Sequence, residues 1–164
     1  MTPINATLLV RTSADSVWAL ITHFAKYAEW NHLTPTIDGD ARLNERLVVT
    51  LTPMGLRPST LRARVLVAAR NRELRWCGTG RIPGLLKIEH GFRIEQRADG
   101  CRLFHSLSCE GWRANDRLTA ALRRSFDATD AALLARINGV LAAPPEPAMP
   151  ETVEAARPLM VTTG

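Results

Sequence analysis

Hydrophobic and polar residues alternate over most of the stretch 85–112, and the alternation is interrupted once, at Asp99-Gly100. Alternation with a period of two is typical of a β-strand with one buried face. An Asp-Gly pair between two such segments is a strong hairpin signal, because both central residues of the tight turn adopt positive φ. The pattern therefore predicts two long antiparallel strands joined at Asp99-Gly100.

The register of this hairpin decides which side chains face the interior together. With Asp99-Gly100 as a two-residue loop, His90 lies opposite Cys109, and in the same register His105 lies opposite Ile94. Opposed residues share a face of a sheet, so both histidines fall on an inner face that is otherwise apolar. Four ladder positions separate them, or roughly 13 Å at about 3.3 Å per residue. This spacing predicts that the two histidines cannot bind one metal ion or act as a pair.

The residues before the hairpin predict one early strand, two short helices and further strands. Segment 4–11 is rich in β-branched and aliphatic residues, which favour strands. Ser13 is a favourable N-cap, and Asp15 suits the dipole of a short helix that ends near His23. A second short helix is expected over 24–29. Alternating residues predict strands at 45–52, 60–69 and 73–79.

The stretch after the hairpin predicts one long helix. Apolar residues recur every three or four positions from Leu118 to Leu141, which is the spacing of an amphipathic helix roughly 40 Å long. Asn115-Asp116 is a plausible N-cap. Phe126 lies on the apolar side, and charged residues, Asp130 among them, are assigned to the opposite side.

This order of elements predicts an α+β fold in one domain, 1–142. The inner face of the antiparallel sheet must be covered, and only the final helix is long enough to cover it. A twisted sheet curled around one helix leaves a gap towards one end, and such gaps serve as ligand pockets. Gly78, Gly80 and Gly84 predict a loop over this cavity. Segment 143–164 is rich in proline and is expected to form a flexible tail.

Composition narrows the class further. Apolar residues make up 46% and charged residues 23% of the 164, as in ordinary globular domains. We see neither an apolar run of the length that spans a bilayer nor the pattern of a signal peptide, so we expect no membrane insertion. Three cysteines without a CxxC motif favour a reducing compartment, so we expect a cytoplasmic protein. The net charge of +5 comes from arginines spread over all segments, which does not predict a nucleic-acid partner.

Several short motifs, in this order, resemble the START-like (SRPBCC) superfamily and, within it, the polyketide cyclase/dehydrase branch. They are Ser13-Ala14-Asp15-Ser16-Val17-Trp18, Tyr27-Ala28-Glu29-Trp30-Asn31, Arg72-Glu73-Leu74-Arg75-Trp76, Glu89-His90-Gly91-Phe92-Arg93-Ile94-Glu95, and Gly100-Cys101-Arg102 with His105 and Gly111. The resemblance spans about 4–141. It implies a helix-grip fold, in which a curved antiparallel sheet of about seven strands wraps around a long C-terminal helix, with two short helices after the first strand.

The resemblance also implies a closed hydrophobic cavity for a polyketide, lipid or isoprenoid-like molecule. Some members are cyclases, aromatases or dehydratases, and others only bind or carry ligands. Two departures matter here. His32 stands where the family usually has proline, and Leu107 stands where an acidic residue often faces the cavity. The missing carboxylate makes the expected cavity more apolar and weakens an acid–base mechanism.

The candidate ligand-binding residues are the inner-face positions and the end of the second short helix: Trp30, Asn31, Trp76, His90, Phe92, His105, Leu107, Cys109 and Phe126. His90 and His105 are the catalytic candidates, because imidazole titrates near neutral pH. The alternatives are structural: core histidines, a loop-bracing Asn31, core aromatic rings and a buried Cys109. Histidine spacing typical of a metal site is missing, so neither a metal nor another cofactor is expected.

Three functional hypotheses follow. The first is a protein that binds a hydrophobic small molecule between the sheet and the C-terminal helix. The second is an enzyme of the polyketide cyclase/dehydratase type, in which the cavity histidines move protons while a bound chain folds, dehydrates or cyclises. The third is a regulatory interaction domain that uses its Pro-rich tail. A monomer and a homodimer are equally compatible with the sequence.

Overall fold

A curved antiparallel sheet packed against one long helix forms the framework of the molecule. The computed structural model describes residues 3–112 and 114–142, and side chains up to Gly139. The elements are β1 (Ile4–Val10), α1 (Ala14–Thr22), the 3-10 helix η1 (Phe24–Glu29), β2 (Thr36–Asp38), β3 (Arg46–Leu51), β4 (Ser59–Ala69), β5 (Glu73–Thr79), β6 (Lys87–Arg97), β7 (Gly100–Glu110) and α2 (Asp116–Ala142).

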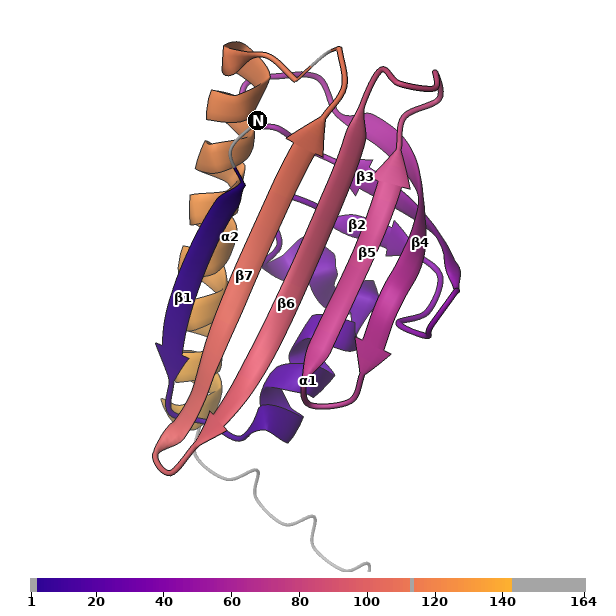
Figure 1. Cartoon of the computed structure of the whole chain (residues 1–164). Helices are drawn as coiled ribbons and strands as arrows, with labels where there is room; N and C mark the ends of the chain where they lie inside the picture. The colour runs from indigo at the N-terminus through magenta and orange to yellow at the C-terminus, as the bar shows by residue number, and fades with distance from the viewer. Residues whose placement is uncertain (1–2, 113, 143–164) are drawn as a thin grey trace, which may run out of the picture.

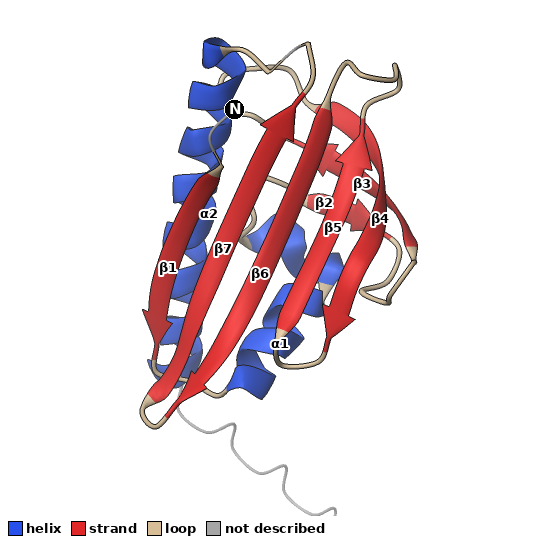
Figure 2. Cartoon of the chain, viewed as in Figure 1, coloured by secondary structure: helices blue, strands red, loops and turns tan. Residues whose placement is uncertain are grey.

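The seven strands lie in the order β1-β7-β6-β5-β4-β3-β2, and every neighbouring pair is antiparallel (Figure 2). The sheet curls so that β2 and β3 turn back towards the side on which α2 lies (Figure 1). The predicted α+β helix-grip architecture is therefore confirmed. The short strand β2 is the one strand that the alternation did not locate, because three residues are too few to establish a period.

Two helix caps explain where α1 and α2 begin. The Ser13 hydroxyl accepts a hydrogen bond from the Ser16 N–H at 3.1 Å, as its position before α1 predicted. The Asn115 side-chain oxygen accepts one from the Leu118 N–H at 2.9 Å and caps α2 in the same way. Within the described residues, no helix combines the length and hydropathy of a membrane span.

The hairpin between β6 and β7 has a different register from the predicted one. Its loop is Ala98-Asp99, and Gly100 is already paired with Arg97. Gly100 has φ +140°, and a Cβ atom there would collide with the carbonyl oxygen of Val10 at the end of β1. The glycine is therefore required by the close approach of a third strand rather than by the turn alone.

This change in register moves every pairing by two residues. His90 lies opposite Leu107 rather than Cys109, and His105 lies opposite Phe92 rather than Ile94. Because the shift is even, each side chain keeps its predicted face. The two histidines, however, come two ladder positions closer to each other.

The inner face of α2 also differs from the prediction at one position. Asp130 was assigned to the charged outer side, but it faces the sheet and is only 8% exposed. It lies four residues after Phe126 and three before Leu133, both buried, so helical periodicity places it on the same stripe. A carboxylate is therefore buried in the core opposite the hairpin.

Candidate functional site

A buried chain of three polar side chains connects α2 to the hairpin. His90 on β6 and His105 on β7 approach each other with their Nε2 atoms 2.8 Å apart. On its other side, the His105 Nδ1 atom lies 2.6 Å from Oδ1 of Asp130. We call these three residues the Asp–His–His relay. The prediction that the histidines are too far apart to interact is wrong, because it rested on the wrong hairpin register.

Aromatic rings hold the relay in a fixed orientation. The His105 imidazole is stacked between Phe92 and Phe126, with ring centroids 4.4 and 3.9 Å away and nearly parallel planes. The His90 ring lies 5.1 Å from Trp76 and meets the edge of Phe92 at 5.0 Å. His90 and His105 are 1% and 0% exposed. The relay therefore operates in an apolar, water-excluding environment.

Burial favours the neutral form of all three groups. It raises the pKa of the Asp130 carboxyl from 3.8 to about 7 and lowers the pKa of His105 to about 3. Burial, with the neighbouring His105 imidazole as a second cause, lowers the pKa of His90 well below its ordinary value. At neutral pH both imidazoles are uncharged, and the carboxyl is the group that titrates.

The hydrogen bonds of the relay can run in either direction. With Asp130 ionised, His105 Nδ1–H donates to the carboxylate and His90 Nε2–H donates to His105. His90 Nδ1 is then an acceptor, and it has no hydrogen-bond partner within the described residues. If this atom takes up a proton, the other two protons can shift along the chain and neutralise Asp130. The arrangement thus has the chemistry of a general base whose charge is stored on the helix.

A metal site is a different use of such residues, and the geometry does not favour it. In the described part of the chain, no three His, Cys, Asp or Glu side chains are grouped so that they could hold a metal ion. The relay forms a line of hydrogen bonds rather than a convergent set of ligands.

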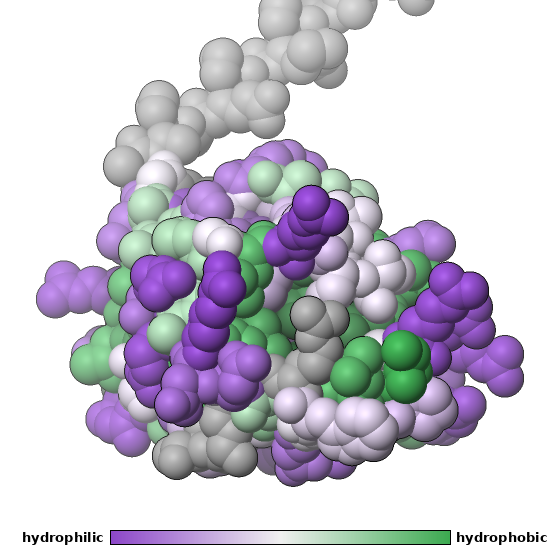
Figure 3. Space-filling model, turned by 90° about the horizontal axis from the view of Figure 1, so that it is seen from above, coloured by the Kyte–Doolittle hydropathy of each residue, from purple (hydrophilic) through white to green (hydrophobic). Residues whose placement is uncertain are grey.

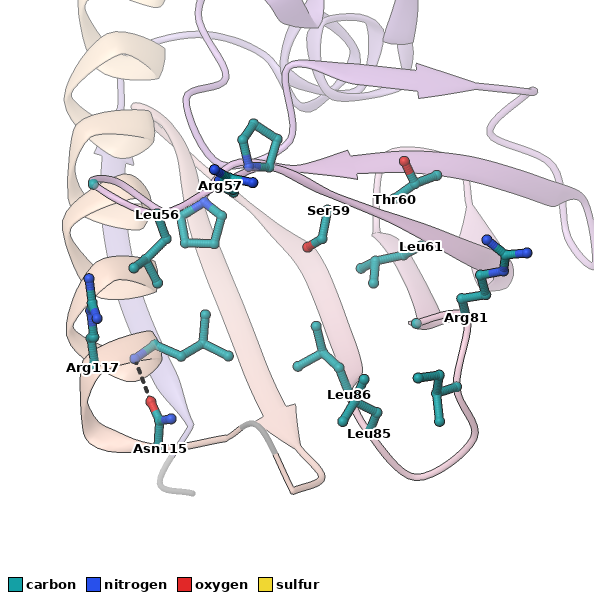
Figure 4. Close-up of a pocket in the computed structure, with 16 residues that line it drawn as sticks. Leu56, Arg57, Ser59, Thr60, Leu61, Arg81, Leu85, Leu86, Asn115 and Arg117 are labelled. Carbon is teal, nitrogen blue, oxygen red and sulfur yellow. Dashed lines mark hydrogen bonds between the residues drawn. The ribbon is translucent and has the colours of Figure 1, made fainter.

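A pocket of about 830 Å³ lies at one end of the molecule, away from the relay. It is formed by the β3–β4 loop with the start of β4, by the β5–β6 loop and by the first turn of α2 (Figure 4). Leucines from all three segments provide its apolar lining: Leu56, Leu61, Leu85, Leu86 and Leu118. Figure 3 looks down on this end and shows apolar atoms in the hollow with polar groups around it.

Two residues of α2 hold the β3–β4 loop in place as a wall of the pocket. The Ser125 hydroxyl donates to the Thr52 carbonyl and accepts from the Met54 N–H, both at 2.8 Å. The Arg124 guanidinium donates to the Met54 carbonyl at 3.1 Å. The shape of the pocket therefore depends on the same helix that carries Asp130.

None of the nine predicted ligand-binding residues lines this pocket. Leu86 lines it, and His90 follows four positions later, roughly 13 Å further along at about 3.3 Å per residue. Buried Ile88 lies between them on the same face. The pocket therefore stops short of the relay, and ligand contact by the nine residues stays a prediction.

The residues predicted near the second short helix have structural roles. The Asn31 side-chain oxygen accepts hydrogen bonds from the N–H groups of Leu33 and Thr34, at 3.1 and 2.7 Å. This is the loop-bracing alternative considered for Asn31. Trp30 is buried with its ring against Tyr27.

Two candidates on β7 also belong to the core. Cys109 is a buried free thiol, and Leu107 lies beside His90.

Sequence reasoning did not identify the pocket leucines or Asp130. The glycines near 78–84 did point to a loop at the cavity, and Gly80 lines the pocket. For Asp130, the signal was available in the spacing 126, 130, 133, 137 along the helix. Its charge obscured that signal, because charged residues were assigned to the outer side.

An antiparallel sheet that grips a long C-terminal helix is the fold of START-like proteins, and this chain has it. The chain belongs to the polyketide cyclase/dehydrase and lipid transport family, whose sequence model matches residues 1–138. The search among curated proteins found no match.

Solved structures with the same fold are distant in sequence. A START superfamily protein from Mycobacterium smegmatis is 19% identical, with a TM-score of 0.67 over 84% of this chain and 98% of that one. The Zhui aromatase/cyclase from Streptomyces sp. R1128 is 16% identical, with a TM-score of 0.68 over 85% and 95%. A hypothetical protein from Helicobacter pylori, jhp0584, is 14% identical, with a TM-score of 0.67 over 82% and 87%. At these identities the likeness concerns the fold alone.

Proposed function

We propose that this protein binds a hydrophobic small molecule, such as a polyketide, lipid or isoprenoid, in the pocket between β4, the β5–β6 loop and α2. The observation that carries this proposal is the pocket itself. Its volume of about 830 Å³ falls within the roughly 300–1,000 Å³ of small-molecule sites. Its leucine lining comes from segments far apart in the sequence, and a packed core would not leave these side chains around an open space. Membership of the polyketide cyclase/dehydrase and lipid transport family also supports the binding of a hydrophobic small molecule.

Two residues of β4 offer a matched test. Ser59 lines the pocket and points to the side of β4 on which Leu85 and Leu86 lie (Figure 4), whereas Arg62 is exposed and does not line the pocket. Ser59→Trp should therefore fill the pocket, and Arg62→Trp should leave it open. We expect the neutral dye Nile red to bind the wild type and Arg62→Trp but not Ser59→Trp, as measured by fluorescence. Equal dye binding by both variants would contradict the proposed site.

A second candidate function is acid–base catalysis of the cyclase or dehydratase type, with the relay as the proton acceptor. It is favoured by one specific observation: the Nδ1 atom of His90, at the end of the relay, has no hydrogen-bond partner among residues 3–112 and 114–142. A substrate would have to extend from the pocket past Ile88 to reach that atom. The test is turnover of a poly-β-keto thioester analogue by the wild type and Asp130→Asn. Full turnover by the variant would remove the relay from the mechanism.

Two further expectations belong to this proposal. The cytoplasm is the expected compartment, because three free thiols, Cys77, Cys101 and Cys109, suit a reducing environment. The tail 143–164, expected to be separate from the domain, lies outside the described residues. If regulation through that tail is the function instead, its deletion should abolish activity while Nile red binding by residues 1–142 persists.

A further inference from the structure

Three arginines stand around the pocket, each from a different segment. Arg57 belongs to the β3–β4 loop, Arg81 to the β5–β6 loop and Arg117 to the first turn of α2 (Figure 4). All three are exposed. Within the described residues, none of them has an ion pair or a side-chain hydrogen bond, and the pocket lining contains no Asp or Glu. The lining of the pocket is therefore mainly apolar, and its charged members are all arginines.

Some arginines elsewhere on this protein have acidic partners. Arg70 lies 2.9 Å from Asp15, and Arg75 lies 3.0 and 3.1 Å from Glu73 and Glu89. Positive charges gathered around a low-dielectric pocket raise the local concentration of anions. A guanidinium also matches the planar geometry of carboxylate and phosphate oxygens and can bind them through two hydrogen bonds.

We propose that the ligand of this pocket is an amphipathic anion, whose apolar chain contacts the leucines and whose carboxylate or phosphate head binds Arg57, Arg81 and Arg117. This inference rests on the proposed function and adds the charge and polarity of the ligand to it. The head lies at the solvent side, because the arginines are exposed while Leu61 and Leu86 are buried. The apolar chain then extends towards Ile88 and the core.

The experiment compares ligands that share one tail and differ in the head. Decanoate, decyl phosphate, decanol and decyltrimethylammonium, each below its critical micelle concentration, compete with Nile red for the wild-type protein. We expect the better anion to bind about tenfold more tightly than decanol, as charge-assisted hydrogen bonds would produce. The cation should bind most weakly. A preference for decanoate over decyl phosphate assigns a carboxylate head, and the reverse preference assigns a phosphate.

Matched variants test whether the three arginines cause the preference. The triple variant Arg57→Gln, Arg81→Gln, Arg117→Gln should bind anion and alcohol equally while keeping its affinity for decanol. Arg123→Gln is the control, because Arg123 is exposed on α2 but does not line the pocket. It should keep the wild-type preference. Raising the salt concentration should shrink the preference of the wild type, since exposed charges are screened.

The possible failures are distinguishable. If decanol binds the wild type as tightly as both anions, or if the triple variant keeps the preference, the anionic head is wrong while apolar binding stands. Loss of the preference in Arg123→Gln would likewise overturn the assignment, because general surface charge would then be its cause. If none of the four compounds displaces Nile red, the proposed function fails together with the inference.

Discussion

The relay and the pocket reverse the usual placement of polar and apolar groups in opposite ways. In the relay, a carboxyl and two imidazoles are buried among aromatic rings, where unpaired polar groups are costly. In the pocket, leucines face an open space, and its arginines have no ion pair within the part of the chain that the structure describes. Packing alone would favour neither arrangement, so both regions are candidates for function.

The relay and the pocket differ in the interactions that fix their geometry. The relay is fixed by sheet pairing, ring stacking and two hydrogen bonds, so its geometry exists before any ligand arrives. The pocket is built from two loops and a helix end, and its shape depends on a few polar contacts with α2. A preformed group suits chemistry or stability, whereas a loop-lined space suits the entry of a ligand. Variants that damage one region and not the other should separate these roles.

The largest effect is expected where the relay meets the core. Phe126→Ala removes a buried ring that stacks on His105 and should lower the free energy of unfolding by about 3–5 kcal/mol. Leu56→Ala, in the half-buried pocket loop, should cost less than about 1 kcal/mol. Urea unfolding followed by circular dichroism measures both. Similar losses in the two variants would mean that the two regions do not differ in their contribution to stability.

The next effect concerns the hydrogen bond from the helix to the hairpin. Asp130→Leu leaves His105 Nδ1 without a partner in an apolar environment and should cost about 1–3 kcal/mol of unfolding free energy. Asp130→Asn keeps an oxygen that can accept from His105 Nδ1–H, so its cost should be smaller. The same urea experiment ranks the two variants. A leucine variant as stable as the wild type would show that the carboxyl contributes nothing to the fold.

The pH dependence of stability provides a signature that only the relay should produce. Since burial raises the pKa of Asp130 from 3.8 to about 7, the folded state holds this proton at pH values where the unfolded state has lost it. The contribution of the protonated carboxyl is complete below about pH 4 and is lost as the pH rises towards 7. Wild-type stability should therefore fall relative to Asp130→Asn across this range.

The histidines act in the opposite direction but do not obscure this comparison. The pKa of His105 is lowered from 6.5 to about 3, so its contribution to stability is present above 6.5 and is lost as the pH falls towards 3. That contribution raises stability as the pH rises, so a fall of wild-type stability relative to Asp130→Asn has the sign of the carboxyl and not of the imidazole. A difference that stays constant from pH 4 to pH 7 would contradict the raised carboxyl pKa.

The fold could be predicted from the sequence because its determinants are local. Alternation, helical spacing and the cap at Ser13 each act within a few residues. The hairpin register is not determined locally, because Asp99-Gly100 allows the glycine to lie either in the turn or in the strand. The contact that decides between them comes from Val10, far away in sequence. The relay was missed for that reason, and because Asp130 was placed by its charge rather than by its spacing.

The pocket could not be predicted, because its walls come from three segments that share no local pattern. Positions 53–61, 80–86 and 115–118 look like turns and a helix start in the sequence. Only the curvature of the whole sheet brings them together. The general expectation of a gap at one end of the sheet was sound, but the residues assigned to it belong to the packed core.

A smaller stability effect than at Phe126 or in Asp130→Leu is expected at Ser125, where α2 anchors the pocket wall. Ser125→Ala leaves the Met54 N–H and the Thr52 carbonyl without this partner. Because these groups lie in a loop that water can reach, the cost should be about 1 kcal/mol. Nile red affinity should nevertheless fall severalfold, since the β3–β4 loop is no longer held against the helix. The control is Ser106→Ala on the outer face of β7.

The pH signature of Asp130 should be unchanged in Ser125→Ala, because the hydroxyl makes no hydrogen bond to the relay. If Ser125→Ala altered that signature and left dye binding intact, the relay and the pocket would not be separable regions.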